Sequence, residues 1–177
     1  METMKKLILT TALLISSLTF GQQFAVSIVQ DAKLALKGDK IGNEPFTTNV
    51  IVNFELRGRD NGVGYVVMMP SLEYANLKGG DYYRYGVNGG YTFTGFIHFD
   101  ITPQAGVGFI SRKLDSWEGE ATFYPSFNIG VDISVHIVKN VDLVLLNQLT
   151  DRKDLKMIWG HKQYFNYSFY AGIKYKF

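Results

Sequence analysis

The sequence of 177 residues has no cysteine, only four prolines and no marked excess of charge of either sign. Without cysteine, the chain has no disulfide framework, no thiolate metal site and no cysteine for a lipid anchor. Its 18 Lys and Arg against 16 Asp and Glu give a net charge of +2, and they form no basic stripe of the kind that binds nucleic acid. We therefore expect no nucleic-acid partner and no cofactor.

Long apolar runs are also missing, except at the N-terminus. There, Lys5 and Lys6 precede an apolar stretch from Leu7 to Leu18, and the small residue Gly21 follows, which is the layout of a secretory signal peptide. The stretch is short of the roughly 18 apolar residues of a spanning helix. We expect residues 1–21 to be a cleaved signal peptide and residues 22–177 to form a single barrel domain.

Aromatic residues and an alternation of apolar with polar residues dominate the remainder. The 11 Tyr and 13 Phe favour a β-rich protein. Odd positions are apolar and even positions mostly polar over long stretches, which is typical of strands with one apolar face. Eight strands are predicted, at Phe24–Leu36, Thr48–Arg57, Val63–Tyr74, Tyr83–Phe93, Phe96–Ile110, Ala121–Ile137, Val141–Thr150 and Tyr164–Phe177.

The predicted connections alternate in length, being long after the first, third, fifth and seventh strands and short after the others. An up-and-down meander with an even number of strands places all long connections at one end. Outer-membrane barrels are built this way, with long loops outside the cell and short turns in the periplasm. We therefore predict an all-β fold, an eight-stranded antiparallel up-and-down transmembrane β-barrel.

Alternation alone leaves two orientations open, because a secreted lipocalin-like binder has eight strands with the apolar face inward. Rings stand at both ends of one face of the fourth and eighth predicted strands, as in two aromatic girdles around a hydrocarbon band. The opposite face collects charges of both signs, which we expect to line the lumen: Asp31, Lys33, Glu55, Arg57, Glu73, Arg84, Asp100, Asp132, Asp142, Lys174 and Lys176.

The signal sequence, the eight alternating strands and the ending "AGIKYKF" resemble the family of small eight-stranded outer-membrane barrels of the OmpA/OmpX type. The resemblance implies a location in the outer membrane of a Gram-negative cell, among outer-membrane lipid and lipopolysaccharide. It also implies that the alternating residues Ile173, Tyr175 and Phe177 form the assembly signal read by the barrel-assembly machinery. We expect only the barrel part of the OmpA comparison to apply to this chain, without the peptidoglycan-binding domain.

Catalysis by this chain is the least supported interpretation. The serine and histidine candidates for a lipid-modifying enzyme are Ser134 with His136, or His98, and they fall on the polar face near the predicted short turns. His161 has no evident serine partner. The expected register sets His98 and Asp142 opposite His136, either as a metal set or as polar pairs inside the barrel. We expect polar pairs, no catalytic or metal site, and no enzyme.

The last long connection, from Asp151 to Gln163, is the candidate contact segment. It mixes cations with apolar residues that could contact lipopolysaccharide or an unknown surface partner, namely Lys156, Met157, Ile158, Trp159 and Lys162. Alternatively, Met157 to Trp159 extend a neighbouring strand. The sequence predicts a structural or surface-interaction role through the outer loops, with polar side chains plugging the lumen; the alternative is a small porin-like pore for ions or small solutes.

Overall fold

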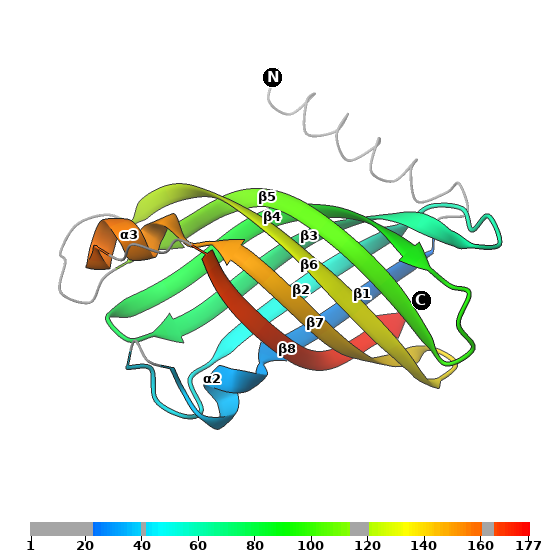
Figure 1. Cartoon of the computed structure of the whole chain (residues 1–177), viewed down its shortest axis with the longest axis horizontal. Helices are drawn as coiled ribbons and strands as arrows, with labels where there is room; N and C mark the ends of the chain where they lie inside the picture. Colours follow the sequence, from blue (N-terminus) through cyan, green and yellow to red (C-terminus); the bar gives the residue numbers. More distant parts are fainter. Residues whose placement is uncertain (1–22, 40–41, 114–120, 161–164) are drawn as a thin grey trace, which may run out of the picture.

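A computed structural model describes residues 23–39, 42–113, 121–160 and 165–177. These residues form one closed barrel in which eight antiparallel strands neighbour one another in chain order (Figure 1). The strands are β1 Phe24–Asp31, β2 Asn49–Arg57, β3 Gly64–Leu77, β4 Gly80–Phe93, β5 Phe99–Arg112, β6 Thr122–Val138, β7 Val141–Asp151 and β8 Phe165–Lys176. The predicted fold class is confirmed. The predicted signal peptide lies outside the described residues.

Strands β1 and β8 close the barrel by antiparallel pairing, from Ala25 opposite Lys176 to Asp31 opposite Tyr170. Gly172 allows the backbones of β1 and β8 to approach each other closely at this seam. A Cβ atom at that position would lie 1.9 Å from the backbone carbonyl oxygen of Ile28, so a residue with a side chain would push the two strands apart.

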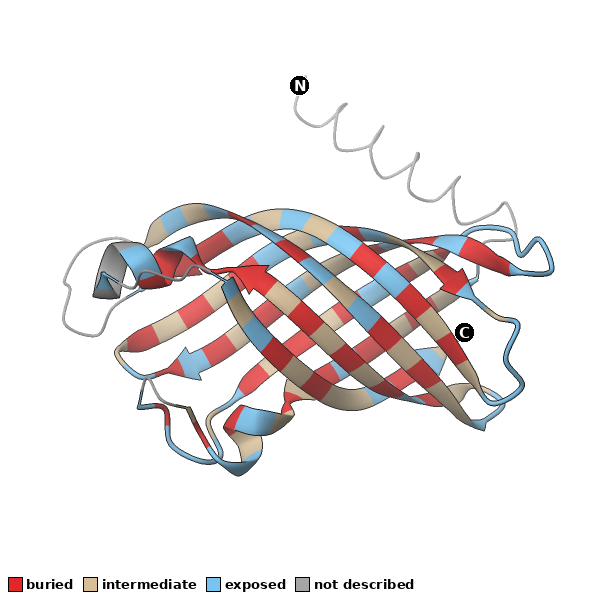
Figure 2. Ribbon diagram, viewed as in Figure 1, coloured by how far each residue is buried: buried red, intermediate tan, exposed pale blue. Residues whose placement is uncertain are grey.

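The outer face of the barrel is apolar, and its interior is mainly polar apart from an apolar cluster of Val29, Ile51, Val144 and Leu146 beside Tyr170. Burial alternates along every strand (Figure 2), and on β6 the exposed Phe127, Ile129 and Val131 interleave with the buried Asn128 and Asp132. The aromatic faces predicted for β4 and β8 also point outward. Because a soluble ligand-binding barrel would turn its apolar face inward, the lipocalin-like alternative is wrong and the outer face suits a hydrocarbon environment.

The first predicted strand is too long. β1 ends at Asp31, and residues 32–36 form the short helix α2, Ala32–Leu36. The Asp31 carboxylate accepts hydrogen bonds from the backbone N–H groups of Lys33 and Leu34, which is the geometry of a helix N-cap. Lys33, predicted to line the lumen, therefore lies exposed on a helix at the barrel end.

The alternation of long and short connections is only partly right. β3 and β4 are joined by the two-residue turn Lys78–Gly79, where a long loop was predicted, because Gly79 (φ 84°) and Gly80 (φ 137°) adopt the positive angles of a tight hairpin. The β4–β5 connection covers residues 94–98 and is longer than predicted, since β5 begins at Phe99. Long connections therefore follow β1, β5 and β7 alone.

Strand lengths differ around the barrel, from 8 residues in β1 to 17 in β6. The rim is consequently uneven, and α2 and a second helix, α3 Lys153–Trp159, lie at the end opposite the C-terminus (Figure 1). We call this the outer end, because the longer connections of outer-membrane barrels face outward. Neither helix in the described part of the chain is long and apolar enough to cross a membrane.

Candidate functional site

A network of buried charges fills the lumen around Lys174. Its ammonium group lies 2.9 Å from a Glu55 carboxylate oxygen and 3.4 Å from one of Asp132, and it donates a hydrogen bond of 2.8 Å to the Ser134 hydroxyl. The Arg57 guanidinium donates to the other Glu55 oxygen at 2.8 Å. All five residues are buried, and the network lies in the half of the barrel near the C-terminus, because Lys174 lies opposite Asp142 at the start of β7.

A smaller cluster surrounds His136 near the β6–β7 turn. Its Nδ1 lies 3.0 Å from an Asp142 carboxylate oxygen, and its Nε2 lies 3.5 Å from one of Asp100. Lys176 also pairs with Asp142, at 2.8 Å. His98, predicted on the polar face of a strand, lies exposed in the turn before β5. Its predicted register opposite His136 is correct at the backbone level, because the His136 N–H donates to the His98 carbonyl.

Towards the outer end, aromatic residues join the lumenal network. The hydroxyl groups of Tyr170 and Tyr82 donate to the two oxygens of Glu73, at 3.0 and 3.4 Å. Arg84 donates to Ser126 and Asn128 across the lumen. Because Tyr82 and Tyr170 are almost wholly buried, their rings occupy space that water would otherwise fill.

Arg152, between β7 and α3, lies above this network. It donates to both oxygens of Asp154, at 2.8 and 2.7 Å, and its guanidinium carbon lies 4.2 Å from the centre of the Tyr82 ring. Burial alone would lower the pKa of the guanidinium, but the contacts with Tyr82 and Asp154 raise it by more, so the net pKa is raised and Arg152 stays charged. Arg152 and Asp154 therefore cover the outer side of the lumen as a buried, neutralised pair.

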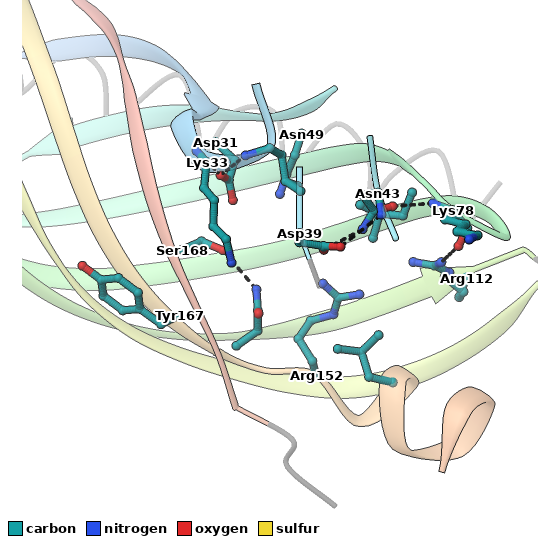
Figure 3. A pocket seen from close by; sticks show the side chains of 14 residues that line it. Asp31, Lys33, Asp39, Asn43, Asn49, Lys78, Arg112, Arg152, Tyr167 and Ser168 are labelled. Atoms are coloured by element: carbon teal, nitrogen blue, oxygen red, sulfur yellow. Dashed lines mark hydrogen bonds between the residues drawn. The ribbon is translucent and has the colours of Figure 1, made fainter. Parts of the chain in front are cut away.

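A cavity of about 300 Å³, which we call the mouth cavity, lies at the outer end of the barrel (Figure 3). Its walls come from α2, the β1–β2 connection, the β3–β4 turn, the end of β5, the start of α3 and the start of β8. Figure 3 shows Lys33 and Arg112 on opposite sides, with Asp39 between them. The charged residues of the lining are Asp31, Lys33, Asp39, Lys78, Arg112 and Arg152.

Both carboxylates of this cavity accept hydrogen bonds from backbone N–H groups. Asp31 caps α2, and Asp39 accepts from the N–H groups of Gly42 and Asn43 at 3.0 and 3.1 Å. Among the described residues, Lys33 and Lys78 form no ion pair. The cavity thus combines immobilised carboxylates with lysines whose charge no described carboxylate neutralises.

The predicted assembly residues Ile173, Tyr175 and Phe177 all lie exposed on the outer face. The Phe177 ring is 5.3 Å from that of Phe24 and 4.9 Å from that of Tyr175, and its N–H donates to the Phe24 carbonyl. The last residues therefore form an aromatic cluster at the β1–β8 seam. Their role in assembly stays a prediction.

The predicted contact segment contains helix α3 where a strand extension was the alternative, so that alternative is wrong. Lys156 is exposed. Met157, Ile158 and Trp159 fall within the helix, but their side chains lie outside the described part of the structure, as do His161 and Lys162 entirely. A contact role for these residues stays a prediction.

The candidate enzyme residues have other partners. Ser134 donates to Asp132 at 2.7 Å and accepts from Lys174, while His136 contacts Asp142 and Asp100. These contacts give Ser134 no histidine base. Across the described residues, no group of three His, Cys, Asp or Glu side chains has an arrangement that could hold a metal ion.

The sequence alone did not predict the mouth cavity, because the segments that carry two of its cations were predicted to have other structures. Lys33 was placed on a strand and Lys78 in a long loop. Asp31 followed by the helix-forming "AKLAL" was a readable N-cap signal, and Gly79–Gly80 was a readable hairpin signal. No local pattern, however, indicates that these residues converge with Arg112 and Arg152.

Three solved structures share the architecture. Ail of Yersinia pestis in phospholipid nanodiscs matches with a TM-score of 0.54 and 17% identity, over 88% of this chain and 99% of that one. A major outer membrane protein of Thermus thermophilus matches at 0.59 and 9%, over 89% and 100%. Neisserial surface protein A matches at 0.53 and 15%, over 88% and 95%.

No family model and no curated protein matches the sequence. The evidence therefore comes from the closed eight-stranded topology, the apolar outer surface and the likeness of fold to these structures. The chain therefore shares the fold of small eight-stranded outer-membrane β-barrels.

Proposed function

We propose that this protein resides in the outer membrane with a closed lumen, and that it acts in surface interactions through its outer end. The observation that carries the proposal is the contrast between the two polar regions. Lumenal charges are paired with one another inside the barrel, whereas the mouth cavity lies beside the outer helices and holds lysines without an ion pair among the described residues.

The closed lumen rests on size and pairing. Eight strands leave an interior just wide enough for side chains to fill. Lys174, Tyr82 and Tyr170 fill this one as large buried groups. A buried charge without a partner would be strongly destabilising, and the contacts of Lys174 with Glu55 and Asp132 remove that penalty. Opening an aqueous path would require these contacts to break.

The surface role rests on what the outer end presents. Helix α3 begins with Lys153 and carries the exposed Lys156, so cations stand where the barrel meets the lipid headgroups. The proposed partners are lipopolysaccharide, through Lys156 and its neighbours, and a ligand outside the cell. Ail, one of the structural neighbours, is named for attachment and invasion, which is consistent with such a role. We propose no enzymatic activity.

Planar bilayers test the closed lumen. The purified protein is expected to show no stable unitary conductance, while Lys174→Ala, which empties the centre of the network, is expected to raise the frequency of brief openings. Lys153→Ala is the matched control, since this half-exposed lysine pairs with Asp151 at the rim. Uniform steps in the unmodified protein, with an ion selectivity that Lys174→Glu alters, would establish a pore instead.

Cell fractionation tests the location. The mature protein is expected to stay in the outer-membrane pellet after urea extraction and to migrate differently on gels before and after boiling, because a closed barrel resists detergent at low temperature. Recovery as a soluble periplasmic protein would overturn the proposal.

A further inference from the structure

The mouth cavity has the size of a small-molecule site. Its volume of about 300 Å³ is at the lower end of the range for ligand pockets, roughly 300–1,000 Å³. Arg152, which is paired with Asp154, lines it, and so do residues of α2 and of the β3–β4 turn. A ligand could therefore enter from outside the cell without passing through the lumen.

The charges of the lining favour an anion. Four cations line the cavity against two carboxylates, and both carboxylates accept hydrogen bonds from backbone N–H groups. Arg152 is balanced by Asp154. Lys33 and Lys78 are exposed cations on opposite walls, without an ion pair in the described part of the chain. An anionic group in the cavity would lie among these cations and could accept charge-assisted hydrogen bonds from them.

A second observation points to a ligand that also donates hydrogen bonds. The side chain of Asn49 lines the cavity with only 4% of its surface exposed. Its Nδ2 donates to the Tyr170 hydroxyl at 3.4 Å, but its Oδ1 has no hydrogen-bond partner among the described residues. Buried carbonyl oxygens are normally satisfied, so this one marks a position for a donor. The neighbouring Asn166 and Ser168 add further amide and hydroxyl groups.

We propose that the mouth cavity binds a small acidic carbohydrate, a sugar that carries a carboxylate or a phosphate. The anionic group lies among the cations that line the cavity, and ring hydroxyl groups donate to Asn49 and exchange hydrogen bonds with Ser168. A bare phosphate ion would contact the lysines but would leave the amide and hydroxyl groups of the cavity without a hydrogen-bond partner. The inference rests on the proposed surface role, because the ligand must arrive from outside.

Titration calorimetry on the full barrel, refolded in nanodiscs free of lipopolysaccharide, tests the site. The probes are galacturonic acid and glucose 6-phosphate, with glucose and inorganic phosphate as controls. Acidic sugars are expected to bind at least about tenfold more tightly than either control, because glucose lacks the charge-assisted hydrogen bonds to the cations and inorganic phosphate lacks the hydroxyl contacts with Asn49 and Ser168. Equal binding of glucose, equal binding of inorganic phosphate, or no binding of any probe would overturn the proposal.

Substitutions sharpen the assignment. The double variant Lys33→Ala, Lys78→Ala is expected to weaken acidic-sugar binding by about tenfold or more, and Asn49→Leu to weaken sugar binding while leaving inorganic phosphate unaffected. Lys153→Ala is the matched control, since Lys153 is a cation at the same end that pairs with Asp151 and does not line the cavity. An equal loss in the control variant would mean a diffuse charge effect and would contradict a defined site.

Two sources share this chemistry, and oligosaccharides separate them. Binding of core oligosaccharide from the cell's own lipopolysaccharide would identify a ligand on the same surface, and binding of uronic-acid oligosaccharides would identify one on another cell. Bilayer conductance on the same preparation separates the two proposals. A barrel that does not conduct and does not bind acidic sugars would overturn this inference alone. A barrel that conducts would overturn the proposal of a closed lumen, and the titration would still test this inference.

Discussion

The lumen and the mouth of this barrel both contain lysines, but the lysines differ in burial and in ion pairing. Lys174 is buried and lies within 3.4 Å of two carboxylates, Glu55 and Asp132. Lys33 and Lys78 line the mouth, are exposed, and form no ion pair with any described residue. Burial makes pairing obligatory, because an unpaired charge inside a confined interior costs several kcal/mol, whereas an exposed charge has no such requirement. Charges in the lumen therefore maintain the fold, and the uncompensated charges at the mouth can attract a ligand.

The largest effect is expected from breaking the lumenal network. Lys174→Ala leaves Glu55 and Asp132 buried without their shared cation, and the expected loss in the free energy of unfolding is about 3–5 kcal/mol. Urea unfolding in lipid bilayers, followed by circular dichroism, measures it. Lys153→Ala removes a half-exposed ion pair at the outer end and is expected to cost about 0–1 kcal/mol. Similar losses in both variants would erase the distinction between lumen and mouth.

The second effect concerns the outer face, which separates both polar regions from lipid. Ile133 lies on the apolar face of β6, so Ile133→Arg is expected to cost about 2–4 kcal/mol if the position is near the bilayer midplane. Ile137, exposed near the β6–β7 turn, is the matched control, and Ile137→Arg is expected to cost about 0–1 kcal/mol there. Unfolding titrations of both variants provide the test.

Spin labels on β6 give an independent measure of the same arrangement. Oxygen accessibility is expected to be high at Val131 and Ile133 and low at Asn128 and Asp132, because the first pair faces lipid and the second faces the lumen. A flat profile, or the opposite phase, would show that the faces are assigned backwards.

A smaller effect is expected at the mouth, where structure depends on local hydrogen bonds. Asp31→Ala removes the N-cap of α2 and is expected to cost about 0.5–2 kcal/mol. Asp31→Asn keeps a capping oxygen and is expected to cost less. Hydrogen exchange of the α2 amides, read beside global unfolding, reports whether the loss is confined to the mouth. A loss as large as that of Lys174→Ala would mean that the mouth and the lumen unfold as one unit.

The sequence predicted the barrel well because alternation is a local signal that β pairing preserves. A one-residue shift of β6 would have placed Asp132 in lipid and Ile133 in the lumen, so the pattern determined both the faces and the strand number. The ends were predicted less well, since alternation passes through Asp31 without marking the helix that it caps. The mouth cavity was missed because Lys33, Lys78 and Arg152 meet only after the chain has closed on itself.

The smallest effect on stability is expected at the opposite end, on the outer surface. Phe177→Ala removes the ring contacts with Phe24 and Tyr175, and the expected cost is about 0.5–1.5 kcal/mol. If Phe177 is part of an assembly signal, the amount of inserted protein in cells should nevertheless fall sharply while refolding into detergent stays largely intact. Phe165→Ala is the matched control, because Phe165 lies on the same face of β8, is exposed, and has one ring partner, Phe127 at 5.5 Å. A comparable fall in insertion for both variants would assign Phe177 to packing, because recognition by the assembly machinery should depend on the position of the ring, whereas packing depends only on its contacts.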